Sequence, residues 1–161
     1  MDNFSRAQDL YQQASMLDQM GRQAEARQLY FESANLGLSW AQHNFAYMCE
    51  KGEGGPEDHI TARKYYKFAA DQGDPTAQHN FARMCHEGKG GPMDFISARN
   101  YSKLAADQSS VFAQVCFAQM CLNGEGGPRD IKLALTYARL AANQNDPMAQ
   151  ELVRYIEQLL R

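Results

Sequence analysis

The sequence predicts an all-α solenoid built from stacked helix–loop–helix repeats. The main evidence is a period of 36 residues that runs without slippage along most of the 161-residue chain. An Ala-Gln pair opens four units, a GxGGP loop follows in the first three, and an Ala-Ala pair closes each of those three. A fixed period of about 20 to 50 residues is typical of units that bury their apolar faces only by stacking on their neighbours.

These markers divide residues 1–161 into parts of a single repeat domain. The Ala-Gln pairs begin at Ala41, Ala77, Ala113 and Ala149, and the loops span 52–56, 88–92 and 124–128. We expect an N-terminal helix pair at 4–37, full repeats at 39–74, 75–110 and 111–146, and a C-terminal capping helix at 147–161. This arrangement predicts nine helices.

The N-terminal pair departs from the pattern, because it lacks the glycine loop and turns instead at Met20-Gly21-Arg22. The C-terminal segment departs too: Pro147 opens one helix whose apolar residues are Leu152, Ile156, Leu159 and Leu160. Terminal units of a solenoid are expected to be atypical, since one of their faces has no neighbouring repeat to cover it.

The first helix of each full repeat carries one apolar stripe. In repeat 39–74 the stripe is Ala41, Phe45, Met48 and Cys49, and offsets of four, three and one place these residues on one helical face. The same types recur 36 and 72 residues later. The GxGGP loop then ends the helix, since glycine adopts the left-handed conformation and proline cannot continue the helix.

The second helix of each repeat begins at an aspartate that suits the N-cap position, at Asp58, Asp94 and Asp130. We expect its buried face to consist of Ala62, Tyr65, Phe68 and Ala69, then Ala98, Tyr101, Leu104 and Ala105, then Ala134, Tyr137, Leu140 and Ala141. The helices should end at Gly73, Ser109 and Asn145. Serine fits the left-handed position less well than glycine or asparagine, so we expect a looser turn at Ser109.

Charge and composition exclude several classes of function. A net charge of −3 and a pI near 5.8 give no electrostatic reason to bind nucleic acid. No run approaches the roughly 18 apolar residues that cross a bilayer, so we expect no membrane insertion. The start, MDNFSRAQD, lacks the basic and apolar regions of a secretory signal, and its initiating Met argues against a leader that has been removed.

The four cysteines indicate a reducing compartment. Cys49, Cys85 and Cys121 occupy equivalent positions in successive repeats, about 10 Å apart for stacked helices, whereas a disulfide needs Cα atoms within about 7 Å. Cys116 lies five residues before Cys121 on one predicted helix and points in another direction. We therefore expect four free thiols and a cytoplasmic protein.

The segment AQHNFAYMCEKGEGGPEDHITARKYYKFAADQG resembles the Sel-one-like repeat, a relative of the tetratricopeptide repeat with a longer internal loop. Phe45, Ala46 and Cys49 stand where the family has Leu, Gly and Tyr, and Tyr65 takes the position of its Trp. The resemblance covers residues 39–145 and implies a right-handed, tetratricopeptide-like superhelix that holds other proteins in a concave groove. Family members occur in bacterial virulence, toxin neutralisation and protein quality control.

No motif points to catalysis, a cofactor or a metal. The GxGGP loops lack the following Lys-Ser/Thr and the preceding strand of a phosphate-binding loop, so we interpret them as helix breaks. The histidines at 43, 59, 79 and 86 lie near Cys49 and Cys85, but no CxxC pair or i, i+4 histidine pair is present. Cys85 and His86 are adjacent and diverge on a helix, which does not suit nucleophilic catalysis.

The helix face opposite the core stripe carries the candidate binding residues. Successive first helices place there Trp40, Asn44, Tyr47 and Lys51; Thr76, Asn80, Arg83 and Glu87; and Phe112, Cys116, Gln119 and Asn123. The resemblance implies that this face lines the groove. From it we predict partner-binding roles for Trp40, Asn44, Tyr47, Asn80, Arg83, Phe112 and Gln119, because Trp, Tyr and Arg often dominate interfaces.

Other roles for these residues stay open. Trp40 and Phe112 could simply pack on a neighbouring unit, and Asn44 and Asn80 could tie neighbouring helices together. The sequence therefore predicts a non-catalytic adaptor that binds a protein or peptide, without a cofactor. The alternatives are a neutraliser of a toxin or enzyme, and a structural subunit of a larger assembly, which an exposed apolar patch on the C-terminal helix would favour. The oligomeric state is left open.

Overall fold

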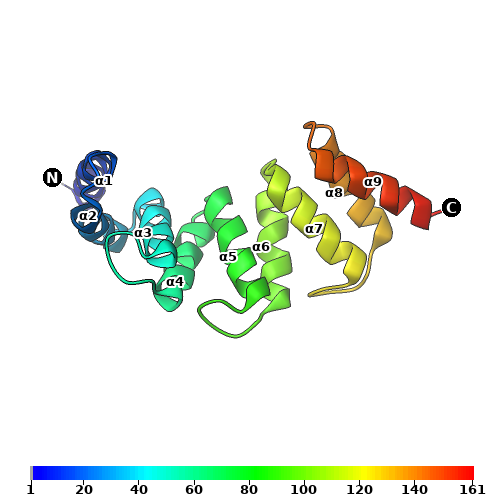
Figure 1. Ribbon diagram of the computed structural model, residues 1–161, viewed down its shortest axis with the longest axis horizontal. Helices are drawn as coiled ribbons and strands as arrows, with labels where there is room; N and C mark the ends of the chain where they lie inside the picture. The colour runs from blue at the N-terminus through cyan, green and yellow to red at the C-terminus, as the bar shows by residue number, and fades with distance from the viewer. Residues whose placement is uncertain (1) are drawn as a thin grey trace. The chain divides into compact units, whose positions relative to one another are not determined.

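The computed structural model describes residues 2–161, and this part of the chain forms nine α-helices and no strand, as predicted (Figure 1). The helices are α1 (Asn3–Gln19), α2 (Gln23–Asn35), α3 (Ser39–Lys51), α4 (His59–Asp71), α5 (Pro75–Glu87), α6 (Phe95–Asp107), α7 (Val111–Asn123), α8 (Ile131–Ala142) and α9 (Pro147–Leu159).

The helices divide into two compact units. Unit 1 contains α1 to α4, the first turn of α5 up to Ala77, and the loop segment 89–92. Unit 2 contains the rest of α5, residues 78–88, and the chain from Met93 onward, with α6 to α9. Within each unit, helices that follow one another in sequence also pack on one another.

The predicted stripe of the first helices is buried in both units. Ala41, Phe45, Met48 and Cys49 are each at most 7% exposed on α3, and their equivalents on α5 and α7 are buried as well. Each stripe phenylalanine meets the tyrosine of the following helix edge-on, with ring centroids 4.8, 4.7 and 4.6 Å apart in the three repeats. Such pairs add about 0.5–1.5 kcal/mol beyond the burial of their area, so the stripe explains why the two helices of a repeat pack together.

The predicted buried face of the second helices was wrong at one exposed position per repeat, and Tyr101 of repeat 75–110 is only half-buried. Phe68, Leu104 and Leu140 are 41, 48 and 45% exposed. The buried face is rotated toward the next positions in the sequence, so that Tyr66 is fully buried on α4. Phe68 instead lies at the edge of this face, where its ring contacts Tyr65 edge-on at 5.6 Å.

Aspartate caps begin the second helices as predicted. One carboxylate oxygen of Asp58 accepts a hydrogen bond from the backbone N–H of Thr61 at 3.0 Å, and Asp94 and Asp130 make the equivalent bonds at 2.9 Å. Hydrogen bonds from Thr61 hold the pKa of Asp58 below its usual value. These carboxylates satisfy a backbone donor that has no partner within the helix.

The expected looser turn at Ser109 was wrong. Ser109 adopts the left-handed conformation with φ of 68°, and Gly73 occupies the same position with φ of 93°. The backbone N–H of Ser109 donates to Ala106 at 3.0 Å, and that of Gly73 donates to Ala70 at the same distance. The serine turn therefore keeps the hydrogen bonding of the glycine turn.

The backbone of each GxGGP loop packs against the second helix of the preceding helix pair. The third residue of the loop approaches so closely that a Cβ would lie 2.3 Å from the Gln23 carbonyl oxygen at Gly54, and 2.0 Å from the Phe95 carbonyl oxygen at Gly126. Real Cβ atoms essentially never come within 3.0 Å of another heavy atom. The glycines thus allow a close backbone contact, in agreement with the helix-break interpretation.

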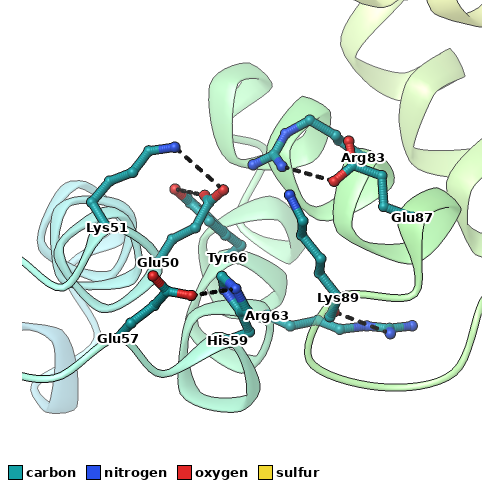
Figure 2. Close-up of polar contacts among 9 residues, drawn as sticks. All are labelled: Glu50, Lys51, Glu57, His59, Arg63, Tyr66, Arg83, Glu87 and Lys89. Atoms are coloured by element: carbon teal, nitrogen blue, oxygen red, sulfur yellow. Dashed lines mark hydrogen bonds and ion pairs between the residues drawn. The ribbon is translucent and has the colours of Figure 1, made fainter.

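An arginine holds each loop from the preceding second helix, and we call this contact the arginine clamp. The clamp residues are Arg27, Arg63 and Arg99, spaced by one repeat period. In unit 2, Arg99 donates to the carbonyl oxygens of Glu125 and Pro128, both at 3.0 Å. In unit 1, Arg27 donates to Glu53 and Pro56 at 3.1 and 2.9 Å. Arg63 donates to Pro92 at 2.9 Å and to Lys89 at 3.5 Å, and Figure 2 shows the contact with Lys89.

The glutamine of each Ala-Gln pair links adjacent helices. In unit 1 the buried amide of Gln42 donates to the carbonyl oxygen of Ala34 at 3.2 Å and accepts from Gln72 at 2.7 Å. In unit 2 Gln114 makes the equivalent bonds at 3.2 and 3.0 Å. A buried amide that makes both kinds of hydrogen bond explains why this residue returns in each full repeat.

The remaining features concern the cysteines and the membrane. All four cysteines are free, and Cys49, Cys85 and Cys121 are buried in the stripe. Within residues 2–161, none of the helices combines the length and the hydrophobicity needed to cross a bilayer.

Candidate functional site

The seven predicted partner-binding residues all lie on first helices, and they fall in two units. Trp40, Asn44 and Tyr47 belong to α3 in unit 1. Asn80 and Arg83 on α5, with Phe112 and Gln119 on α7, belong to unit 2.

The unit 1 residues form an exposed aromatic surface. Trp40 is 56% exposed and Tyr47 is 42% exposed. The Trp40 ring contacts Tyr11 of α1, with centroids 6.2 Å apart, so it is anchored at one edge and open at the other. Asn44 is half-buried. Burial raises the pKa of Tyr30 on α2, and the nearby Asn44 side chain acts in the opposite direction.

Unit 2 contains a pocket of about 660 Å³ between the first helices α5, α7 and α9. It is lined by His79, Ala82, Arg83, His86, Glu87, Ser102, Phe112, Cys116, Gln119, Met120, Leu122, Asn123, Glu125, Leu152 and Tyr155. Three of the four predicted residues of this unit, Arg83, Phe112 and Gln119, line the pocket, and Asn80 does not. A volume between about 300 and 1,000 Å³ is in the range of pockets that take small ligands or several side chains.

Two exposed aromatic side chains line the pocket. Phe112 is 72% exposed and Tyr155 is 53% exposed, on α7 and α9 respectively. Cys116 and Leu152, which are half-buried, add apolar surface to the lining. Burial raises the pKa of the Cys116 thiol, so it stays protonated at neutral pH and behaves as an apolar surface.

The charged side chains of the pocket form two pairs. A guanidinium nitrogen of Arg83 lies 3.4 Å from a carboxylate oxygen of Glu87, one turn further along α5 (Figure 2). The Nε2 atom of His86 lies 2.8 Å from a carboxylate oxygen of Glu125, which belongs to the loop held by Arg99. Because the carboxylates are matched by cationic or titratable partners, the pocket has no strong field of one sign.

His79 lies at the inner side of the pocket and is held neutral. Burial, together with the nearby Arg83 charge, lowers the pKa of His79 below its ordinary value of 6.5. Its Nδ1 atom is buried and has no hydrogen-bond partner among residues 2–161. Its ring lies 6.3 Å from that of Phe112, so the two side chains share one wall of the pocket.

Some pocket residues were not predicted. Leu152 and Tyr155 come from α9, whose residues 148, 152, 155 and 159 continue the repeat register of 112, 116, 119 and 123. The 36-residue period was therefore a sufficient signal for these two residues. The pair between His86 and Glu125 joins a helix to a later loop, and no spacing rule in the sequence indicates that contact.

Metal ligands are not grouped in the described part of the chain. Residues 2–161 contain no cluster of three or more His, Cys, Asp or Glu side chains with the geometry to hold a metal ion.

Unit 1 contains a smaller pocket of about 340 Å³. It is lined by Arg27, Phe31, Phe45 and Gly54, among others, and so lies beside the loop that Arg27 contacts.

Comparison with known proteins identifies the repeat. The family model described as Sel1 repeat matches residues 3–19, 41–74, 75–110 and 114–146, which is most of the chain. No curated protein sequence matches the chain significantly.

Two solved structures have the same fold. One is a protective antigen of uropathogenic Escherichia coli strains that displays an SLR fold, with a TM-score of 0.78 and 28% identity over 81% of this chain. The other is a Sel1 repeat protein from Oxalobacter formigenes, with a TM-score of 0.77 and 27% identity over 81% of this chain. This chain spans 28% and 54% of those two proteins. The matches confirm the predicted all-α repeat fold, and the chain belongs to the Sel1 repeat family.

Proposed function

We propose that the chain is a non-catalytic protein-interaction module whose unit 2 pocket receives apolar side chains of a protein or peptide partner. The observation that carries the proposal is that two exposed aromatic residues, Phe112 and Tyr155, line one pocket whose surface is mostly apolar. Exposed aromatic side chains at the centre of a surface are the most frequent anchors of protein interfaces. Membership of the Sel1 repeat family, whose members commonly mediate protein interactions, supports the same conclusion.

The polar side chains suit the recognition of a peptide backbone. Gln119 is exposed at the pocket and carries both a donor and an acceptor, as does Asn123. The paired charges leave no strong single-sign field, so the partner residues that enter the pocket are expected to be uncharged. A lining carried mainly by packed helices is preorganised, which lowers the ordering cost of binding.

The exposed aromatic surface of unit 1 provides a second contact in this proposal. Trp40 and Tyr47 present large rings that are only partly covered by their own unit. A partner that also contacts these residues would gain further apolar contact area on unit 1. We also propose that the protein resides in a reducing compartment, the cytoplasm, which suits four free thiols.

An affinity pull-down from the lysate of the native host tests the pocket. The baits are the wild type, Phe112→Gln, and Ile96→Gln, which replaces an apolar residue of α6 that is similarly exposed, at 66%. We expect one protein to be retained by the wild type and by Ile96→Gln and to be lost with Phe112→Gln. The retained protein is then purified and titrated calorimetrically against all three chains.

The controls separate loss of binding from loss of folding. Phe112 is largely exposed, so Phe112→Gln should leave the far-UV circular dichroism unchanged. If Phe112→Gln retains the same protein as the wild type with the same affinity, the pocket is not the binding site and the proposal fails.

A further inference from the structure

Helix α9 carries an apolar stripe that is exposed except at Leu152, which packs on the core of unit 2. Met148, Leu152, Tyr155 and Leu159 are spaced by four, three and four residues, which places them on one face of α9. Met148, Tyr155 and Leu159 are 64, 53 and 44% exposed, and Leu152 is half-buried. We call these four residues the α9 stripe, and they extend along about 16 Å of the helix.

The equivalent face of every other first helix contains polar residues. It mixes Trp40 and Tyr47 with Asn44 and Lys51 on α3, and Phe112 and Cys116 with Gln119 and Asn123 on α7, and it is polar throughout on α5. Only α9 among these helices carries four apolar or aromatic residues on this face. It is continuous with Phe112 of α7, because Leu152 and Tyr155 line the same pocket as Phe112.

The stripe is also distinct from the face on which helices of a repeat pack together. On α7 the face toward α8 includes the buried Phe117 and Cys121. The residues in the same register on α9 are Val153 and Glu157, and Glu157 forms an ion pair with Arg139 of α8 at 2.7 Å. Packing within unit 2 thus covers part of Leu152 and leaves Met148, Tyr155 and Leu159 exposed.

We propose that two copies of this chain associate through their α9 stripes around a two-fold axis. A two-fold contact requires a surface that is complementary to itself. The α9 stripe meets this condition because its four side chains are all uncharged, so no like charges face each other across the axis. The exposed Glu151, Arg154 and Gln158 of α9 lie outside the stripe and provide a polar rim.

The available area matches a reversible dimer. Large aromatic side chains bury roughly 150–250 Å² each, so the exposed parts of Phe112 and Tyr155 offer roughly 250 Å² together. With Met148 and Leu159, the apolar area reaches on the order of 400 Å² per copy. Since homodimer interfaces are about two-thirds apolar, the two copies would bury roughly 1,200 Å² in total. This value is at the lower end of the range for specific interfaces.

The association would regulate the pocket, an extension that rests on the proposed function. Leu152 and Tyr155 belong both to the stripe and to the pocket lining, so one set of side chains cannot contact a second copy and a partner simultaneously. Dimer and partner complex would then compete, and dilution would favour partner binding.

Sedimentation velocity of the 161-residue chain at about 1 to 100 μM tests the association. The variant is Met148→Gln with Leu159→Gln, which alters the stripe at residues that do not line the pocket. The matched control is Met93→Gln, since Met93 is 65% exposed in unit 2, almost as much as Met148, but lies outside the stripe. We expect the wild type and the control to form dimers, and the variant to dissociate at a concentration at least about tenfold higher.

Two results would overturn the proposal: a wild type that is monomeric throughout this range, or a double variant that dimerises as tightly as the control. The first result would leave the stripe to a different partner. The test is independent of the pull-down, because Met148 and Leu159 lie outside the pocket. If the double variant loses the dimer but still captures the partner, both proposals are supported. If Phe112→Gln captures the same protein as the wild type, only the proposed function fails.

Discussion

Two glycines of the third GxGGP loop differ in how closely their surroundings approach, and this difference predicts unequal effects of alanine. Gly124 and Gly126 both adopt the left-handed conformation, with φ of 74° and 67°. The nearest atom to a Cβ at Gly124 is the backbone nitrogen of Arg129 at 3.3 Å, whereas at Gly126 it is the carbonyl oxygen of Phe95 at 2.0 Å. Alanine should therefore be tolerated much better at the first position.

The magnitudes follow from two separate terms. An alanine in the left-handed conformation costs about 1–2 kcal/mol at either position. At Gly126 the Cβ would also lie 1 Å inside the closest approach that real Cβ atoms show, against a backbone atom that cannot rotate away. Forcing the loop off α6 adds about 1–3 kcal/mol for overpacking and weakens the contacts of Arg99. We expect a loss of about 1–2 kcal/mol for Gly124→Ala and about 2–5 kcal/mol for Gly126→Ala.

Urea unfolding followed by far-UV circular dichroism measures both variants against the wild type. Both variants carry the same cost of an alanine in the left-handed conformation. The difference between their free energies of unfolding therefore reports the backbone contact alone. A second comparison uses Arg99→Leu alone and combined with Gly126→Ala. If Gly126→Ala already detaches the loop, the double variant should lose less stability than the sum of the two single variants. Equal free energies of unfolding for Gly124→Ala and Gly126→Ala, within about 0.5 kcal/mol, would refute the close contact between the loop and α6.

Two further predictions concern the arginine clamp and the pocket. Arg99→Leu should lower the free energy of unfolding by about 2 kcal/mol, because two charge-assisted hydrogen bonds are lost, while Arg139→Leu, which removes an exposed ion pair, should cost less than about 1 kcal/mol in the same urea titration. His79→Gln should change the pH dependence of stability. The folded wild type keeps His79 neutral while the unfolded chain protonates it near pH 6.5, so wild-type stability should fall as the pH drops through about 6.5 and the variant should lose less over that interval. Parallel pH profiles for the two proteins, measured by thermal unfolding, would contradict the assigned environment of His79.

The periodic part of the fold could be predicted because each repeat solves the same packing problem with the same residues. The stripe around Phe45, the aspartate cap at Asp58 and the left-handed end at Gly73 are local features, and local spacing identifies them. The face of the second helix was less predictable. Two helix neighbours cover it, and the sequence does not indicate how far the helix is rotated between them, which is why Phe68 was assigned to the core.

The pocket was predictable only in part for the same reason. Arg83, Phe112 and Gln119 lie on a face that helical spacing defines, and the structure places all three in one pocket. Asn80 lies on the same predicted face but outside the lining, since the pocket occupies only part of each helix. The contact of His86 with Glu125 depends on how a loop lies against a helix of the previous repeat. This is a feature of the three-dimensional structure that local spacing does not indicate.

The clamp position shows how the repeat pattern and the local contacts constrain each other. Arg27, Arg63 and Arg99 each precede a GxGGP loop by the same distance, and each donates to carbonyl oxygens of that loop. The next position in this register is Leu135, whose side chain packs on the core cluster of unit 2. The register thus carries arginine where the side chain contacts a loop and leucine where the side chain contacts the core, which argues that the loop contact, and not helix formation, sets the arginine.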